Sequence, residues 1–146
     1  MQAPEPSAKP CTEDGLPLLG VGGGDPELIL RRVAEARGIP DPTERSVRLY
    51  FLGKGLLDCD DADPIDAVAV LAESMDLGSP HAAFELGGYL LRDAETPDEV
   101  AAALTLFERA ALGGLVEAQT LLGKILMENP ATRGAGQEWL RRAGAD

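Results

Sequence analysis

The chain has 146 residues and a formal net charge of −12 at pH 7; 45% of the residues are hydrophobic and only 4% are aromatic. This length suits a single domain with a buried core. The charge argues against nucleic acid or an anionic membrane surface as a partner, because both need a basic protein surface, and it favours a protein partner with a basic surface. No stretch approaches the roughly 18 to 20 apolar residues of a membrane span.

Residues 1–24 contain four prolines and five glycines without helical or strand periodicity. This composition predicts a flexible arm, whose apolar run at residues 16–19 is suited to docking on the rest of the chain. The glycine run at residues 20–24 lacks the strand and the G-x-G-x-x-G spacing of a dinucleotide site, and also the Gly-Lys-Ser/Thr ending of a P-loop. A linker is therefore the better interpretation.

The N-terminus shows no signal peptide, which predicts a cytoplasmic protein. The alternative is a periplasmic or secreted protein whose mature chain received Met1 as an added start, since the residues that follow resemble a mature exported N-terminus. Cys11 lies in the arm and Cys59 in an acidic loop, without C-x-x-C spacing. Two free thiols and a disulfide that holds the arm both remain open.

The first predicted helix covers residues 25–38, with Asp25 as N-cap, Pro26 at the first helical position and Gly38 after the end. The spacing of Leu30, Val33, Ala34 and Arg37 predicts its apolar stripe. Terminal elements of helical repeat proteins are atypical because one face meets water, so we expect an N-terminal capping helix. A partner-binding arm is the alternative.

A Leu-Gly pair then recurs at intervals of 34 and 36 residues: Leu52-Gly53, Leu86-Gly87 and Leu122-Gly123. Glycine inside a helix costs about 1 kcal/mol relative to alanine. Three glycines in the same register therefore predict three places where a second helix approaches closely, as in a stacked helical repeat.

The surrounding residues repeat as well, and they divide residues 25–146 into the capping helix and three repeats at 43–78, 79–114 and 115–146. Four residues before and after each leucine lies one stripe of the first helix: Arg48, Ala82 and Ala118, then Leu56, Leu90 and Leu126. The second helix carries a small residue and then a bulky pair: Ala67 with Val70-Leu71, Ala103 with Leu106-Phe107, and Gly136 with Trp139-Leu140. Gly78 and Gly113-Gly114 predict αL caps at the ends of the first two second helices.

These residues resemble the Sel-one-like repeat, a relative of the tetratricopeptide repeat, over about residues 43–144. The middle repeat matches best, whereas Arg48 and Ser74-Met75 depart from the pattern in the first repeat. The resemblance implies an all-α fold: an α-solenoid of about three antiparallel helix pairs, used for protein–protein contacts and without a catalytic residue. With the helix at residues 25–38, the predicted fold is this solenoid with an N-terminal capping helix.

Catalytic and metal-binding patterns are weak. The only histidine, His81, falls in the first turn of a predicted helix, where surface histidines are common, and no nucleophile motif accompanies it. The acidic run that starts at Asp58 has Asp63 and Ala69 where an EF-hand loop needs glycine and glutamate. We interpret it as a solvated loop whose carboxylates favour the next helix N-terminus. No cofactor, metal ligand or catalytic residue is predicted.

A helical wheel nominates a binding surface. Positions two and six residues after each small residue lie opposite the core stripe, at about 100° per residue, and first helices line the concave face in this class of stack. The six residues are Tyr50, Lys54, Phe84, Gly88, Thr120 and Lys124. Aromatic anchors with flanking charge are typical of peptide-binding grooves. Alternatively, Phe84 fills the space between repeats.

The sequence therefore predicts a non-catalytic adaptor or scaffold, a monomer or weak homodimer, that binds a peptide or protein on its concave face. One alternative is an inhibitor or immunity partner of a toxin or enzyme. A hydrolase is the alternative from another class.

Overall fold

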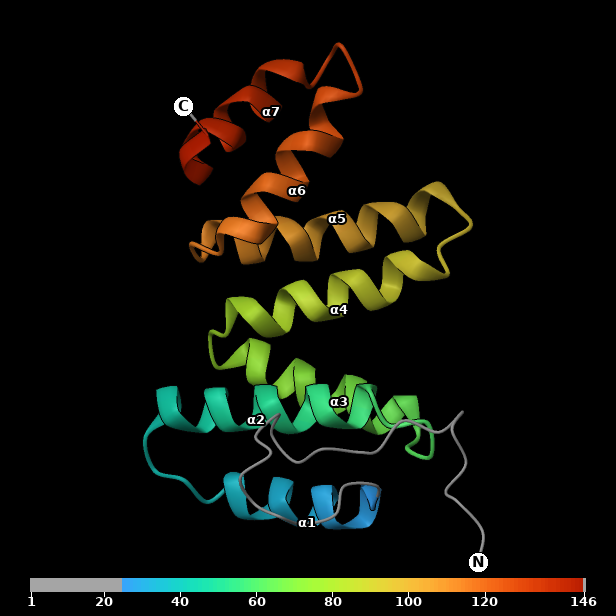
Figure 1. The fold of residues 1–146 in the computed structure, drawn as a ribbon, viewed down its shortest axis with the longest axis vertical. Coiled ribbons are helices and arrows are strands. Elements are labelled where there is room, and N and C mark those ends of the chain that lie inside the picture. Colours follow the sequence, from blue (N-terminus) through green and yellow to red (C-terminus); the bar gives the residue numbers. More distant parts are fainter. Residues whose placement is uncertain (1–24, 146) are drawn as a thin grey trace, which may run out of the picture. The chain divides into compact units, whose positions relative to one another are not determined.

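The protein is described by a computed structural model that covers residues 25–145, so the predicted arm and Cys11 lie outside the described residues (Figure 1). All regular secondary structure in the described chain is helical, and no strand occurs there. Seven α-helices and a short π-helix follow one another: α1 (Pro26–Ala36), α2 (Pro42–Leu57), α3 (Pro64–Asp76), α4 (Pro80–Arg92), α5 (Pro97–Leu112), α6 (Val116–Met127), α7 (Arg133–Leu140) and η2 (Arg141–Ala145). The predicted all-α class is confirmed.

Helices α1 to α5 begin in the same way, with proline in the first turn after a side chain that accepts a backbone hydrogen bond. The caps are Asp25, Asp41, Asp63, Ser79 and Thr96. Such a cap satisfies an amide that has no partner within the helix, and proline loses nothing there because its missing N–H would be unpaired. The predicted start at Asp25 is confirmed, and so is the role of the acidic loop in capping the following helix.

The contacts divide the chain into two compact units, Met1–Gly78 and Ser79–Asp146. In the first unit, α2 packs against both α1 and α3. Helix α1 buries Ile29, Val33 and Ala36, so the predicted stripe through Leu30 and Arg37 was wrong. Burial follows the i, i+4, i+7 row that starts at Ile29, which belongs to the same core cluster as the buried residues of α2 and α3.

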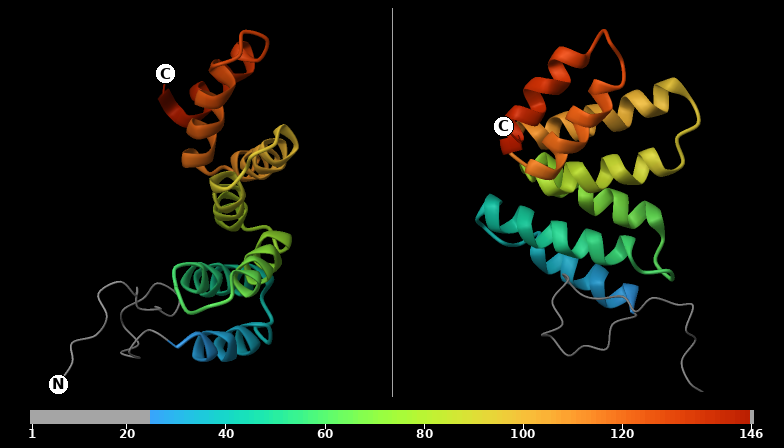
Figure 2. Two further views of the ribbon diagram at one scale, coloured as in Figure 1. Left: turned by 90° about the vertical axis from the view of Figure 1, so that its right-hand side faces the viewer. Right: turned by 45° about the horizontal axis from the view of Figure 1, so that its top comes forward.

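In the second unit, α5 packs against both α4 and α6, and α7 and η2 pack against α6. Helices α4 and α5 run antiparallel, and α6 and α7 form the last hairpin (Figure 2). Gln119 is buried in this unit, and its side-chain amide donates a 3.0 Å hydrogen bond to the carbonyl oxygen of Ala111. The bond satisfies a polar group in the interior between α5 and α6.

Each Leu-Gly pair places its glycine against the second bulky residue of the following helix. A Cβ atom on Gly53 would lie 2.8 Å from Cγ of Leu71, and one on Gly87 would lie 2.9 Å from Cε1 of Phe107. On Gly123 it would lie 2.7 Å from Cγ of Leu140. These distances are shorter than side-chain contacts permit, so the predicted close approach is confirmed three times.

The ends of the second helices also follow the prediction. Gly78 after α3 has φ +107°, and Gly114 after α5 has φ +95°. Both values lie in the left-handed region, where glycine carries no steric penalty.

One predicted core position is exposed, and one residue that departs from the repeat pattern is buried. Leu90 is 41% exposed, because it lies in the last turn of α4 beyond the buried residues that end at Gly87. Ser74, which replaces alanine in the first repeat, is fully buried, and its hydroxyl donates a 2.6 Å hydrogen bond to the carbonyl oxygen of Ser46. Arg48 is exposed, as its departure from the small-residue pattern suggests.

Candidate binding surfaces

The six residues nominated from the sequence lie on three helices. Tyr50 and Lys54 lie one turn apart on α2 in the first unit, whereas the other four lie on α4 and α6 in the second unit. Gly88 and Lys124 are exposed, and the remaining four are half-buried. Phe84 contacts the ring of Phe107 with centroids 5.6 Å apart, which supports its interpretation as a packing residue. The binding role of the six residues stays a prediction.

The positions of the first helices that face outward are shifted by about one residue from those predicted from the sequence. Burial includes the residue after each small position and the glycine after each leucine: Leu49 and Gly53, Ala83 and Gly87, Gln119 and Gly123. When these residues are included, the centre of the buried side of the helix rotates. The residues opposite that centre are then the one before the small position, the third after it and the sixth after it. The sixth position agrees with the prediction, whereas the second lies at the edge of the outward face.

On α2 this outward direction carries apolar side chains. Val47 is 48% exposed and Phe51 is 36% exposed, one turn apart. The ring of Tyr50 lies edge-on to that of Phe51, with centroids 5.1 Å apart, and Lys54 follows one turn further. We call Val47, Tyr50, Phe51 and Lys54 the α2 face. The equivalent positions of α4 and α6 are mainly polar or glycine: His81, Glu85 and Gly88, then Glu117, Leu121 and Lys124.

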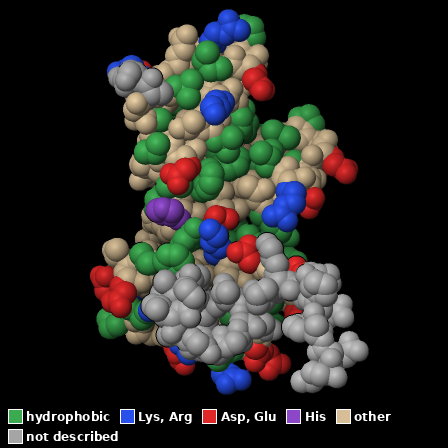
Figure 3. Space-filling model, in the orientation of Figure 1, with side chains coloured by type: hydrophobic (Ala, Val, Ile, Leu, Met, Phe, Trp, Pro, Cys, Tyr) green, Lys and Arg blue, Asp and Glu red, His purple; other side chains and the backbone are tan. Residues whose placement is uncertain are grey.

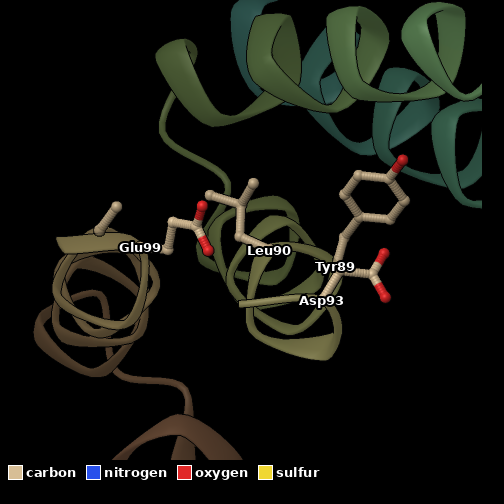
Figure 4. Close-up of a pocket in the computed structure, with 5 residues that line it drawn as sticks. Tyr89, Leu90, Asp93 and Glu99 are labelled. Atoms are coloured by element: carbon tan, nitrogen blue, oxygen red, sulfur yellow. The ribbon is translucent and has the colours of Figure 1, made fainter. Parts of the chain in front are cut away.

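A cavity of about 290 Å³ opens where the end of α4 meets the start of α5. Tyr89, Leu90 and Asp93 line it from α4 and its C-cap, and Glu99 and Ala102 line it from α5. Leu90 lies in the middle, with the Glu99 carboxylate on one side and Tyr89 and Asp93 on the other (Figure 4). We call this the α4–α5 cavity. Apolar, acidic and basic side chains intermix on the visible face of the second unit (Figure 3).

The carboxylate of Glu99 is fixed by a capping box. Its Oε2 atom accepts hydrogen bonds from the backbone amides of Glu95, at 2.6 Å, and Thr96, at 3.3 Å. The Thr96 hydroxyl in turn accepts from the amide of Glu99 at 3.2 Å. Neither backbone amide uses Oε1. The box therefore holds a negative charge at the edge of the cavity in a defined position.

A second cavity, of about 410 Å³, lies in the first unit and is lined mainly by polar residues: Arg37, Arg45, Leu49, Glu73, Asp76 and Leu77. The guanidinium of Arg37 donates to both carboxylate oxygens of Glu73, with Nη2 at 2.9 Å from Oε2. This hydrogen bonding raises the pKa of Arg37 above its usual value, and the Glu73 charge adds to the effect. The pair joins the end of α1 to α3.

Cys59 is buried, with 4% of its surface exposed, and it is disulfide-bonded. The free-thiol alternative is therefore wrong for this residue, while Cys11, the other cysteine of the sequence, lies outside the described residues. His81 is exposed in the first turn of α4, as expected. Within residues 25–145, no cluster of three or more His, Cys, Asp or Glu side chains is arranged to hold a metal ion.

None of the helices in the described part of the chain combines the length and apolar character needed to cross a bilayer. Comparison with protein-family models, with curated proteins and with solved structures found no match.

Proposed function

We propose that this protein is a non-catalytic protein-binding module built as a short α-solenoid, with α1 as its N-terminal cap and the α2 face as a principal contact surface. The partner is a protein or peptide whose apolar anchor meets the α2 face and whose basic surface meets acidic side chains elsewhere on the chain, since Lys54 belongs to the face itself. The observation that carries the proposal is the exposure of Val47 and Phe51 on one face of a helix whose other side is buried.

The argument for binding rests on what the exposed side chains contribute to folding. Val47 and Phe51 keep about half and about a third of their surface in contact with solvent, so they add less to the core than Leu49 and Leu52, which are 1% exposed. Adjacent apolar and aromatic side chains at a helix surface are typical of interaction sites. The net charge of −12 favours partners of opposite charge.

The test is affinity capture with the immobilised protein from an extract of its source cells, followed by calorimetry with the purified captured protein. The double variant Val47→Asp, Phe51→Asp should weaken binding by about tenfold or more, because it introduces charge at an apolar anchor. The matched control is Ile65→Asp, which changes a 75% exposed residue at the start of α3 in the same unit. The control should bind like the native protein.

Both variants must retain the native far-UV circular dichroism spectrum for the comparison to count. Equal binding by the double variant, the control and the native protein would exclude the α2 face as the contact surface. Turnover of the captured protein would favour the hydrolase alternative. Loss of a captured enzyme's activity in a stoichiometric complex would identify an inhibitor.

We also propose that the protein works in an oxidising compartment, in place of the cytoplasm. The disulfide of the buried Cys59 supports this, because disulfides persist in extracellular and periplasmic proteins and are rare in the cytosol. Intact mass spectrometry of protein isolated from its source under alkylating conditions tests the proposal. Incorporation of two alkyl groups without prior reduction would contradict it.

A further inference from the structure

We infer that the α4–α5 cavity binds one arginine or lysine side chain of a partner peptide. The inference rests on the proposed function, because it names the partner chemistry that a second surface of the same module would recognise. The size of the cavity comes first. At about 290 Å³ it lies at the lower end of the range of about 300 to 1,000 Å³ found for small-molecule sites. It therefore suits a single long side chain better than a nucleotide-sized cofactor.

The walls match the two parts of such a side chain. Leu90, 41% exposed, and Ala102 offer apolar surface for the aliphatic stem. The carboxylates of Asp93 and Glu99 lie on opposite sides of Leu90, so each offers a separate acceptor for a charged head whose stem crosses Leu90 (Figure 4). Lysine and arginine side chains bind in this way, with the stem against apolar surface and the head at a polar rim.

One feature prepares the cavity for a cation. The capping box already holds Glu99, so its carboxylate loses little freedom when a ligand binds. The helix ends add no net preference, because the C-terminal end of α4 favours positive charge there and the N-terminal end of α5, which carries Glu99, disfavours it. One cation of the chain is nearby: the guanidinium carbon of Arg92 lies 5.6 Å from the ring centroid of Tyr89. The partner's charge is therefore expected to contact the Glu99 carboxylate, with Asp93 adding attraction from the other side of Leu90, and to leave the Tyr89 ring to Arg92.

The experiment is a titration of the full-length ¹⁵N-labelled protein with a capped four-residue peptide that contains one arginine and one leucine. Two control peptides replace the arginine by norleucine and by glutamate. The arginine peptide should produce saturable amide shifts at Tyr89, Leu90 and Asp93, and the shifts should weaken as the salt concentration rises. The norleucine and glutamate peptides should bind more weakly in that order.

The matched variants remove charge without removing structure. Glu99→Gln retains a side chain that completes a capping box, and Asp93→Asn retains the shape of the C-cap residue. Each should weaken the arginine peptide by about two- to fivefold, as expected for a partly exposed ion pair. Glu95→Gln changes the net charge equally in the same loop, but its side chain does not line the cavity, so it should leave the affinity unchanged.

Absence of saturable shifts with the arginine peptide would overturn the inference. Equal weakening by Glu95→Gln and Glu99→Gln would also overturn it, because the binding would then reflect net charge alone. The proposed function is tested separately by Val47→Asp, Phe51→Asp. If the arginine peptide binds at the cavity but the Val47→Asp, Phe51→Asp variant binds the captured partner normally, only the proposal for the α2 face is contradicted. If the peptide does not bind but the double variant loses the captured partner, only the inference for the cavity is contradicted.

Discussion

The first hairpin, α2–α3, and the last hairpin, α6–α7, are built on the same contact but held by different means. In both, the glycine of a Leu-Gly pair meets a leucine of the next helix, Leu71 or Leu140. The first hairpin adds an aspartate cap at the start of each helix and the buried Ser74–Ser46 hydrogen bond, and its loop carries the disulfide-bonded Cys59. Helices α6 and α7 have no side-chain cap hydrogen bond, and α7 is only eight residues long.

The comparison distinguishes the contact that determines which helices pair from the contacts that stabilise the pair. The glycine contact determines which two helices pair, because only glycine admits the neighbour at that distance. The caps and the buried hydrogen bond determine how firmly the pair is held. We therefore expect the first hairpin to resist denaturant better than the last. Trp139, the only tryptophan, lies in α7 and its fluorescence reports on the last hairpin separately from the circular dichroism of the whole chain.

The largest expected effect comes from truncating the leucines that meet the glycines. Leu71 is fully buried and Leu140 is half-buried, so Leu71→Ala should lower the free energy of unfolding by about 2 to 5 kcal/mol and Leu140→Ala by less. Urea unfolding measured by circular dichroism checks both. A larger loss for Leu140→Ala would reverse the comparison.

Reduction of the disulfide at Cys59, in the loop of the first hairpin, should destabilise the first unit more than the last hairpin. Native disulfides contribute about 2 to 4 kcal/mol, so a reducing agent should lower the urea midpoint of the circular dichroism transition. The Trp139 fluorescence transition should shift less. The control is Cys59→Ser, whose midpoint should no longer depend on the reducing agent. An unchanged native midpoint would show that the disulfide does not stabilise the fold.

The last hairpin can be broken where its backbones meet. A Cβ atom on Gly136 would lie 2.7 Å from the carbonyl oxygen of Gly123 and 2.9 Å from the amide nitrogen of Met127. Gly136→Ala should therefore cost about 1 to 3 kcal/mol despite the higher helix propensity of alanine. Gly134→Ala, in the same helix with no atom within 4 Å, should instead stabilise by roughly 0.5 kcal/mol. Trp139 fluorescence in urea compares the two, and equal effects would contradict the steric argument.

The smallest expected effect concerns a single cap. Asp63 accepts a 2.9 Å hydrogen bond from the amide of Ile65 at the start of α3. Asp63→Ala should cost about 1 kcal/mol, whereas Asp61→Ala in the same loop removes an equal charge outside the cap. Thermal unfolding should separate the two variants by a few degrees. Equal thermal midpoints for Asp63→Ala and Asp61→Ala would show that Asp63 contributes only through its charge.

The pairing of the helices could be predicted because glycine in a helix has few physical causes. The Leu-Gly register predicted three close approaches, and all three occur. The outward face of the first helices was harder to predict, because the helical wheel took the small residues and the leucines four residues later as the centre of the buried side. Those same glycines already implied that the position after each leucine is buried. Including it would have indicated Val47 and Phe51 as outward residues.

Other features have no local signal. Ser74 departs from the repeat, but its hydrogen bond to Ser46 joins residues 28 apart in sequence. The sequence around either residue therefore does not predict this bond. The α4–α5 cavity likewise depends on how far Leu90 extends beyond the buried part of α4. The capping box at Thr96 and Glu99 does have a local signature, and it could have indicated one wall of the cavity.

Within each unit, the helices pack chiefly on their neighbours along the chain. Such a protein is modular in the genetic sense, since duplication or loss of about 35 codons adds or removes one whole hairpin and its own internal contacts. The helices that contact each other are also joined by short loops. Each hairpin can therefore form soon after its second helix leaves the ribosome.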